Sequence, residues 1–343
     1  SLISSVSAGD LSVTGSAKAT YNILKGGSIG NASKGIGIAN DINFGASGEL
    51  DNGMSWNYQI QMDPASGGNA AFDDSQLTIT SGYGTLGIYV TEGGLDTDNS
   101  ASQSVYGRPS DIGLATGMLD GPAISSFNNL QYHLPSGTLP FEGTFKAAYA
   151  TGQDTTINST DAAGTQQDGY GDTAEQYQVT AVPVEGLKVF ADYYKESGAS
   201  AGFVVQNFEA GSLAATYAYG PATFGISRTL RAPLILASSS TLTAINNNSA
   251  AGGNKDSARE YESNKMSAAY NVNDALSISY EVEKSSRELI AQTTENDISS
   301  KALQAAYTMG GMTLALSHGK TDNVGYTLNN DAEQTLFAVT MAF

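Results

Sequence analysis

The sequence predicts an all-β protein, a transmembrane antiparallel β-barrel of about sixteen strands whose long third loop folds into the lumen. Three observations lead to this prediction. Polar and apolar residues alternate over segments that are longer than most strands of soluble proteins. Short turns and long polar loops alternate between these segments. One connection, residues 92–121, has no period, carries several acids and is long enough to have a function of its own.

The composition of the 343-residue chain agrees with a barrel and excludes other classes. The formal net charge is −18, which argues against nucleic-acid binding because that function needs a positive face. Cysteine is absent, so the chain has no disulfide and no thiolate metal site. No apolar run approaches the ~18 residues of a transmembrane helix, and no basic, apolar signal precedes the first strand. If the protein is exported, we therefore expect this sequence to be the mature form.

The strands of the first part of the chain follow from period-two alternation. In residues 11–23, small or apolar side chains occupy the odd positions and polar ones the even positions. Asp51-Asn52-Gly53 is a hairpin turn signal between the second and third strands. The predicted strands here are residues 11–23, 36–50, 55–62, 76–80 and 85–91, with loops over residues 26–35 and 64–74.

The same alternation continues after the long acidic loop. The predicted strands are residues 130–134, 141–149, 176–181, 187–193, 213–219, 224–226, 265–270, 276–283, 303–307, 314–316 and 336–343. Long loops are expected over residues 152–172, 230–257 and 319–332, whereas residues 197–208 fit neither a strand nor a loop clearly. Turns rich in Gly, Pro, Asn and Asp join the remaining strand pairs.

The unequal ends of this strand array favour an outer-membrane barrel over a soluble β-sandwich. Such barrels have short periplasmic turns and long extracellular loops, and their strands must cross an apolar band of about 25 Å. A sandwich would also alternate, but its strands are free to be short. Aromatic residues near the strand ends suit the two membrane interfaces. These residues are Tyr21, Trp56, Tyr132, Tyr149, Tyr219, Tyr270, Tyr307 and Phe343.

Several stretches of the chain resemble the trimeric general porins of Gram-negative outer membranes, most of all those of alphaproteobacteria. They are residues 10–23, residues 77–90 (LTITSGYGTLGIYV), residues 128–152 (NNLQYHLPSGTLPFEGTFKAAYATG) and the last strand with Phe337, Val339, Met341 and Phe343. The resemblance implies one porin barrel domain over residues 1–343 and an inward constriction loop over residues 92–121. It also implies a homotrimer that contacts outer-membrane lipids and lipopolysaccharide, passes small hydrophilic solutes and has no enzymatic activity.

The resemblance further implies that acids on the constriction loop face bases on the opposite wall. The acidic side is matched by Glu92, Asp96 and Asp98, with Asp111 and Asp120 as further candidates. The basic or polar side offers Lys18, His133 and Lys146 on strands and Arg108 in the loop itself. Strands two to four lack the family's basic ladder. We therefore expect cation preference, unless most acids lie solvated on external loops or bridge divalent ions to lipopolysaccharide.

Metal and catalytic chemistry have little support in the sequence. Asp96-Thr97-Asp98-Asn99-Ser100 begins with the spacing of a calcium loop but lacks glycine at the sixth position, so Asp96 and Asp98 are weak Ca²⁺ candidates. No other cofactor is expected. The two histidines, His133 and His318, form no cluster with cysteine and offer no catalytic triad.

Four functions fit these observations to different degrees. The first is a passive, water-filled pore for small hydrophilic solutes and ions. A substrate-selective porin is an alternative, although most aromatic residues share the parity that faces lipid. A plugged barrel that acts as an adhesin or structural protein is another. An outer-membrane lipid hydrolase is disfavoured because it needs a histidine beside its nucleophile.

Overall fold

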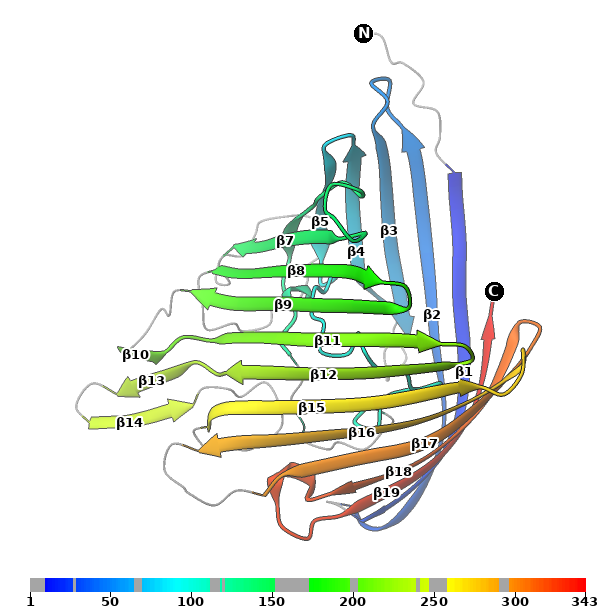
Figure 1. Ribbon diagram of the computed structural model, residues 1–343, viewed down its shortest axis with the longest axis vertical. Coiled ribbons are helices and arrows are strands. Elements are labelled where there is room, and N and C mark those ends of the chain that lie inside the picture. Colours follow the sequence, from blue (N-terminus) through cyan, green and yellow to red (C-terminus); the bar gives the residue numbers. More distant parts are fainter. Residues whose placement is uncertain are drawn as a thin grey trace.

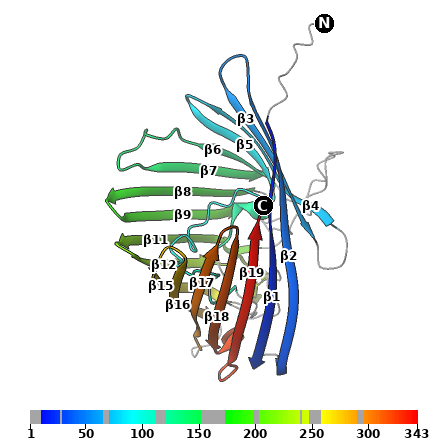
Figure 2. The ribbon, with the colours of Figure 1, turned by 90° about the vertical axis from the view of Figure 1, so that its right-hand side faces the viewer.

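In a computed structural model, the chain wraps into a closed antiparallel barrel (Figure 1). The structure describes residues 10–26, 29–64, 70–111, 118, 121–151, 173–197, 203–238, 241–246, 258–289 and 296–343. Within them, sixteen strands close in the order β1-β19-β18-β17-β16-β15-β12-β11-β9-β8-β7-β6-β5-β4-β3-β2. The predicted all-β barrel of about sixteen strands is confirmed, and β19 closes it against β1 (Figure 2). In the same residues, no helix combines the length and apolarity needed to cross a membrane.

The barrel strands have the following bounds. They are β1 (Asp10–Gly26), β2 (Ile29–Glu49), β3 (Ser55–Pro64), β4 (Ala70–Ser81), β5 (Gly84–Val90), β6 (Asn129–His133), β7 (Thr144–Thr151), β8 (Thr173–Val184), β9 (Leu187–Ser197), β11 (Glu209–Tyr219), β12 (Ala222–Ala232), β15 (Ala258–Asn271), β16 (Leu276–Leu289), β17 (Ile298–Met309), β18 (Met312–Asp322) and β19 (Ala332–Ala342). A separate three-stranded sheet holds β10 (Phe203–Gln206), β13 (Ile235–Ser238) and β14 (Thr241–Asn246). Two 3-10 turns, η1 (Ile124–Ser126) and η2 (Val324–Tyr326), complete the elements.

Each barrel strand turns apolar side chains outward and polar side chains inward. On neighbouring strands, Ile226 pairs with Met266, and both are more than half exposed on the outer face. The intervening positions, Ser227 paired with Lys265, are buried inside. A surface of exposed leucine, isoleucine and methionine needs an apolar solvent. The alternation therefore places lipid outside the wall and a polar space within it.

Four predicted loops are shorter than the sequence suggested. The loop expected over residues 319–332 loses its first residues to β18, which ends at Asp322, and its last to β19, which begins at Ala332. Residues 26–35 were expected to be a loop, but β2 begins at Ile29, opposite Gly26. The loop expected over residues 64–74 is reduced because Pro64 pairs with Ala70. The loop expected over residues 230–257 contains the end of β12 as well as β13 and β14. Backbone pairing continues where the side-chain alternation stops, because beyond the lipid both faces of a strand can meet water.

Candidate functional site

The site is the constriction formed by the connection between β5 and β6, residues 91–128. It extends the predicted constriction loop, residues 92–121, to the start of β6, and we keep the name constriction loop for the whole connection. Its described residues contact the inner faces of strands from β6 to β18, as the following contacts show. In Figure 1 this segment, coloured cyan to green, lies within the ring of strands. The described residues of the loop therefore line the side of the lumen formed by β6 to β18. We call the inner wall of β2 to β4, where Thr91 at the start of the loop bonds Asp74, the open wall.

The root of the constriction loop is held by amide side chains of β6. The side-chain amide of Asn129 donates to the carbonyls of Glu92 (3.1 Å) and Phe127 (2.9 Å). Gln131 donates to the carbonyl of Gly93 and to the side chain of Asn129. One amide thus ties the two ends of the loop together, because residues 92 and 127 bond the same side chain.

The next part of the loop is fastened to β9 and β12. The backbone N–H and hydroxyl of Thr97 both donate to Asp192, at 2.8 and 2.7 Å. The hydroxyl of Ser227 donates to the carbonyl of Asp98 at 2.8 Å. At Gly225, an added Cβ would overlap the carbonyl oxygen of Ala101, so only glycine lets the loop backbone approach this closely.

A buried charge cluster lies where the loop crosses β15 and β16. Lys265 approaches Asp98 (3.4 Å) and Glu283 (3.8 Å), and it donates to Asn99 at 2.5 Å. The side chains of Asp98 and Glu283 are fully buried, and that of Lys265 is 5% exposed. Arg108 of the loop adds a second cation, 3.6 Å from Glu283. Buried charges need such partners, so this cluster fixes the loop to the wall.

The far part of the loop reaches β17 and then the strands that close the barrel. Ser102 and Ser104 both donate to Glu281, at 2.5 and 2.7 Å. Gln304 accepts from the N–H of Tyr106 (3.0 Å) and donates to the carbonyl of Gly107 (2.5 Å). The ring of Tyr106 packs against apolar side chains of β18 and β19, and the ammonium of Lys18 on β1 lies 5.8 Å from its centre.

The inner wall formed by β2 to β4 carries a row of hydrogen-bonded amides, which we call the amide ladder. It consists of Asn43 on β2, Gln59 on β3 and Gln76 on β4. Gln76 donates to Gln59 at 3.0 Å, and Gln59 donates to Asn43 at 3.1 Å. An acid lies two residues before each end of the ladder: Asp41 precedes Asn43, and Asp74 precedes Gln76. Asp74 accepts a hydrogen bond from the Thr91 hydroxyl at the start of the loop, at 2.7 Å. The open wall is therefore neutral along the ladder and acidic beside it.

The predicted acidic residues are divided between different environments. Asp98 is fully buried against the wall, whereas the sequence predicts it on the acidic side of the pore constriction. Glu92 and Asp96 lie near the loop root and are partly exposed. Burial and then the nearby charge of Asp98 raise the pKa of Asp96 to about 7. Asp111 is exposed and paired with Arg108 at 2.5 Å, and Asp120 lies outside the described residues.

The predicted basic and polar residues do not gather opposite the acids. Lys18 faces the loop tip, as described above. His133 and Lys146 pair across β6 and β7 near a short turn, and His133 bonds Gln131 at 2.8 Å. Arg108 is held within the loop–wall contact by Asp111 and Glu283. The structure therefore separates the four groups that the sequence joined into one side of a constriction.

Sequence reasoning missed the wall residues that hold the loop. Alternation places Lys265, Glu281, Glu283 and Asp192 on the inner face, so their direction was predictable. Their partners were not, because the path of an aperiodic loop leaves no pattern in the sequence. No described group of three or more His, Cys, Asp or Glu is arranged to hold a metal ion. The carboxylate of Asp98 instead accepts from Lys265 and from the N–H of Gly121.

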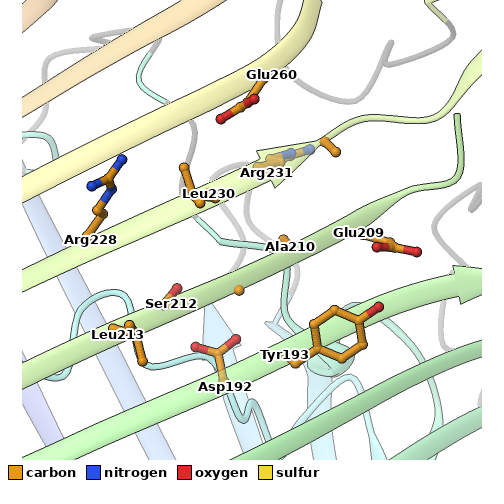
Figure 3. A pocket seen from close by; sticks show the side chains of 12 residues that line it. Asp192, Tyr193, Glu209, Ala210, Ser212, Leu213, Arg228, Leu230, Arg231 and Glu260 are labelled. Carbon is orange, nitrogen blue, oxygen red and sulfur yellow. The ribbon is translucent and has the colours of Figure 1, made fainter.

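A separate cavity of about 490 Å³ lies over β9, β11 and β12 (Figure 3). It is centred where Gly211, paired with Tyr193 and Leu230, has no side chain to fill the space. Tyr193, Leu213 and Leu230 are exposed and share the outward parity. Arg228 beside them forms an ion pair with Glu262 at 2.9 Å. This hollow belongs to the outer face and is distinct from the constriction.

Comparisons with known proteins agree with the barrel. A family model described as Gram-negative porin matches residues 1–343. The curated proteins include no match. A loop-deletion mutant of OmpT, an outer membrane protein of Vibrio cholerae, is similar with a TM-score of 0.67 and 12% identity, over 97% of this chain and 99% of that chain. OmpF of Salmonella typhi in complex with daunomycin has a TM-score of 0.64 and 12% identity, over 98% of each chain. A mutant of the Rh. blastica porin has a TM-score of 0.59 and 13% identity, over 97% of this chain and 100% of that chain. At these identities the likeness shows the fold.

Proposed function

The chain belongs to the Gram-negative porin family and forms an outer-membrane channel, and we propose that this channel is a water-filled, cation-preferring pore for passive diffusion of small hydrophilic solutes. The observation that carries the proposal is the distribution of charge around the passage. Glu92 and Asp96 lie on the loop side, and Asp41 and Asp74 lie on the open wall. In the described part of β1 to β4, Lys18 is the one base that strand parity turns inward. Low-dielectric walls concentrate this negative field and raise the local cation concentration.

Planar-bilayer recording tests both parts of this proposal. We expect stepwise conductance after insertion and, in a KCl gradient, a reversal potential of the sign given by K⁺ permeation. Asp41→Asn should move that potential toward zero. Glu262→Gln removes an acid from the outer face and is the matched control, with no expected change. A silent membrane would contradict the pore, and an anion-selective reversal potential would contradict the assignment of the acids.

We also propose a homotrimer that packs through the outer face of β1 and β2. This face combines the small residues Gly15, Ala17 and Ala19 with side chains that protrude strongly, including Ile36, which is 85% exposed. Small residues let neighbouring backbones approach, and the protruding ones supply contact area. Light scattering in detergent should give three times the 35.5 kDa chain mass. A monomeric mass would contradict this proposal.

Lipopolysaccharide is the proposed lipid partner. Above the apolar band, the outer faces of β16, β17 and β18 carry Lys284, Lys301 and Lys320. Lys301 and Lys320 lie opposite each other in the register of β17 and β18. Cations at this height suit anionic headgroups at the membrane surface. The double variant Lys301→Gln with Lys320→Gln should retain less lipopolysaccharide through purification than Lys188→Gln, which changes an inner-face lysine. Equal retention would contradict a headgroup site here.

A further inference from the structure

We propose that the amide ladder, together with Asp41, is a subsite for short peptides and related amide-bearing cations that pass the constriction. The inference deepens the proposed pore function and rests on it. It names a class of solute and the side chains that would recognise it. Three features carry the argument. The ladder has hydrogen-bonding groups that its own bonds do not use, other glutamine side chains of the inner wall bind the loop backbone, and an acid lies beside the ladder.

The ladder faces the lumen with hydrogen-bonding groups to spare. Tyr58 and Leu77 take the alternate positions on β3 and β4 and are exposed on the outer face, so Gln59 and Gln76 point inward. An amide offers two N–H donors and an acceptor oxygen with two lone pairs. Within the described residues, the ladder's own bonds use one N–H of Gln59, one of Gln76 and none of Asn43. Each amide can therefore bond a solute without breaking the ladder.

The inner wall already uses amide side chains to bind an extended polypeptide, namely the constriction loop. Gln304 pairs with the loop backbone through both its acceptor and its donor, as described above. Gln176 does the same, accepting from the N–H of Ile124 (2.8 Å) and donating to the carbonyl of Pro122 (3.4 Å). Gln178 donates to the carbonyl of Leu95 at 3.0 Å. An amide matches a peptide group because each has one donor face and one acceptor face.

The amide ladder has the same chemistry on the same inner face, but the described part of the loop makes no hydrogen bond to it. Among the described residues, the amides that bond the loop backbone therefore lie on β8 and β17, whereas the ladder amides on β2 to β4 bond one another. A passing peptide group would find there the donors and acceptors that hold the loop elsewhere. The ladder runs across strands, with about 4.8 Å between neighbours, so adjacent rungs can bond successive groups of one solute.

The charge beside the ladder selects among amide-bearing solutes. Asp41 lies two residues before Asn43 on the same face of β2, about 7 Å along the strand. Its carboxylate is exposed and accepts a hydrogen bond from Ser16 at 3.3 Å. If the N-terminal ammonium group of a peptide solute binds Asp41, the peptide groups that follow it lie beside the ladder. A neutral polyol could bond the amides and donate a hydroxyl to the carboxylate, but it has no positive charge to attract that carboxylate, so a peptide with a free N-terminus fits better.

Single-channel recording with triglycine amide tests this inference. Triglycine amide carries one ammonium and several amide groups. Pentylammonium has the charge without the amides, and sorbitol has hydroxyls without the charge. We expect triglycine amide to block the current with longer events than either control solute. The double variant Gln59→Met with Gln76→Met keeps the side-chain length but removes the amides, and it should shorten the block roughly tenfold. Thr78→Val removes a hydroxyl from the same wall and should have no effect.

The outcomes distinguish this inference from the proposed function. Equal block of the wild type and the double variant by triglycine amide would overturn the ladder subsite while the open-channel conductance still supports the pore. Equal block by sorbitol and triglycine amide would overturn the choice of ligand class. Absence of any conductance would overturn the pore and the subsite together. If the double variant does not insert, Asp41→Asn serves instead, since loss of one exposed charge should shorten the block and an unchanged block would overturn the subsite.

Discussion

Replacing Lys265 with methionine should release the constriction loop from the wall. The ammonium of Lys265 lies 3.4 Å from Asp98 and 3.8 Å from Glu283, and all three side chains are almost completely buried. At an effective dielectric constant of about 20, the attraction is about 5 kcal/mol to the first carboxylate and about 4 kcal/mol to the second. The desolvation of the three charges offsets much of this. Removing one partner of such a buried pair costs about 3–5 kcal/mol, because it leaves an uncompensated charge.

A loss of about 3 kcal/mol changes the ratio of docked to undocked loop by roughly a hundredfold. We therefore expect Lys265→Met to give a larger and noisier single-channel conductance, because the loop no longer holds one position in the lumen. The barrel should still insert, since strand pairing does not depend on this side chain. Added Asp98→Asn should restore part of the wild-type behaviour, because it removes one carboxylate that faced Lys265, while Glu283 keeps Arg108 as a partner.

The matched control is Lys188→Met. Lys188 also faces inward, but its ammonium lies 4.8 Å from the ring centre of Phe190 on the same strand. Loss of this contact should leave the loop docked and the conductance steady. If Lys265→Met gives the same current as Lys188→Met, the buried cluster does not hold the loop and the electrostatic reasoning fails.

Three further outcomes follow from the site. Because the pKa of Asp96 is raised to about 7, its carboxyl is neutral below that pH, so cation selectivity measured by reversal potential should fall between pH 8 and 6, and Asp96→Asn should abolish this step. The same shift raises the free energy of unfolding as the pH falls from about 7 to about 4. Asp96 takes up a proton near pH 7 in the folded protein, whereas it does so only near pH 4 in the unfolded chain. Gly225→Val should push Ala101 away and raise the conductance, whereas Gly82→Ala, where nothing lies within 4 Å of an added Cβ, should leave the current unchanged. Gln304→Leu removes the bonds to backbone groups of Tyr106 and Gly107 and should destabilise the docked loop by about 2 kcal/mol, seen as brief extra openings that wild type lacks.

The barrel could be predicted because lipid imposes a rule on every strand. Leu11 to Ile23 alternate so regularly because one side of β1 faces the apolar surroundings of the barrel and the other faces the polar lumen. The rule ends with the lipid, which is why the pairing of Ile29 with Gly26 and of Ala70 with Pro64 left no sequence signal. Strand ends beyond the bilayer are held by backbone hydrogen bonds, and these bonds do not discriminate among side chains.

The constriction could be predicted only in part, because its contacts join residues that are far apart in the chain. Asp98 and Lys265 are separated by 167 positions, and Asp192 meets Thr97 across 95. Strand parity gives the direction of Lys265 and Asp192, but an aperiodic loop has no parity of its own. The sequence therefore indicated an acidic loop inside the barrel without showing which of its acids turn toward the wall.

This division of acids changes the expected mechanism of selection. A transverse field needs opposite charges on facing walls of a pore. Here Lys265 of the wall and Arg108 of the loop form ion pairs with buried carboxylates, and the inner wall of β2 to β4 presents amides and acids. In the proposed cation-preferring pore, Lys18 is then the one inward base of β1 to β4 within the described residues, so the field across the passage is mainly of one sign and orients solutes little. Orientation of a solute must come from hydrogen bonds, and the amide ladder is the part of the open wall that can supply them in a fixed row.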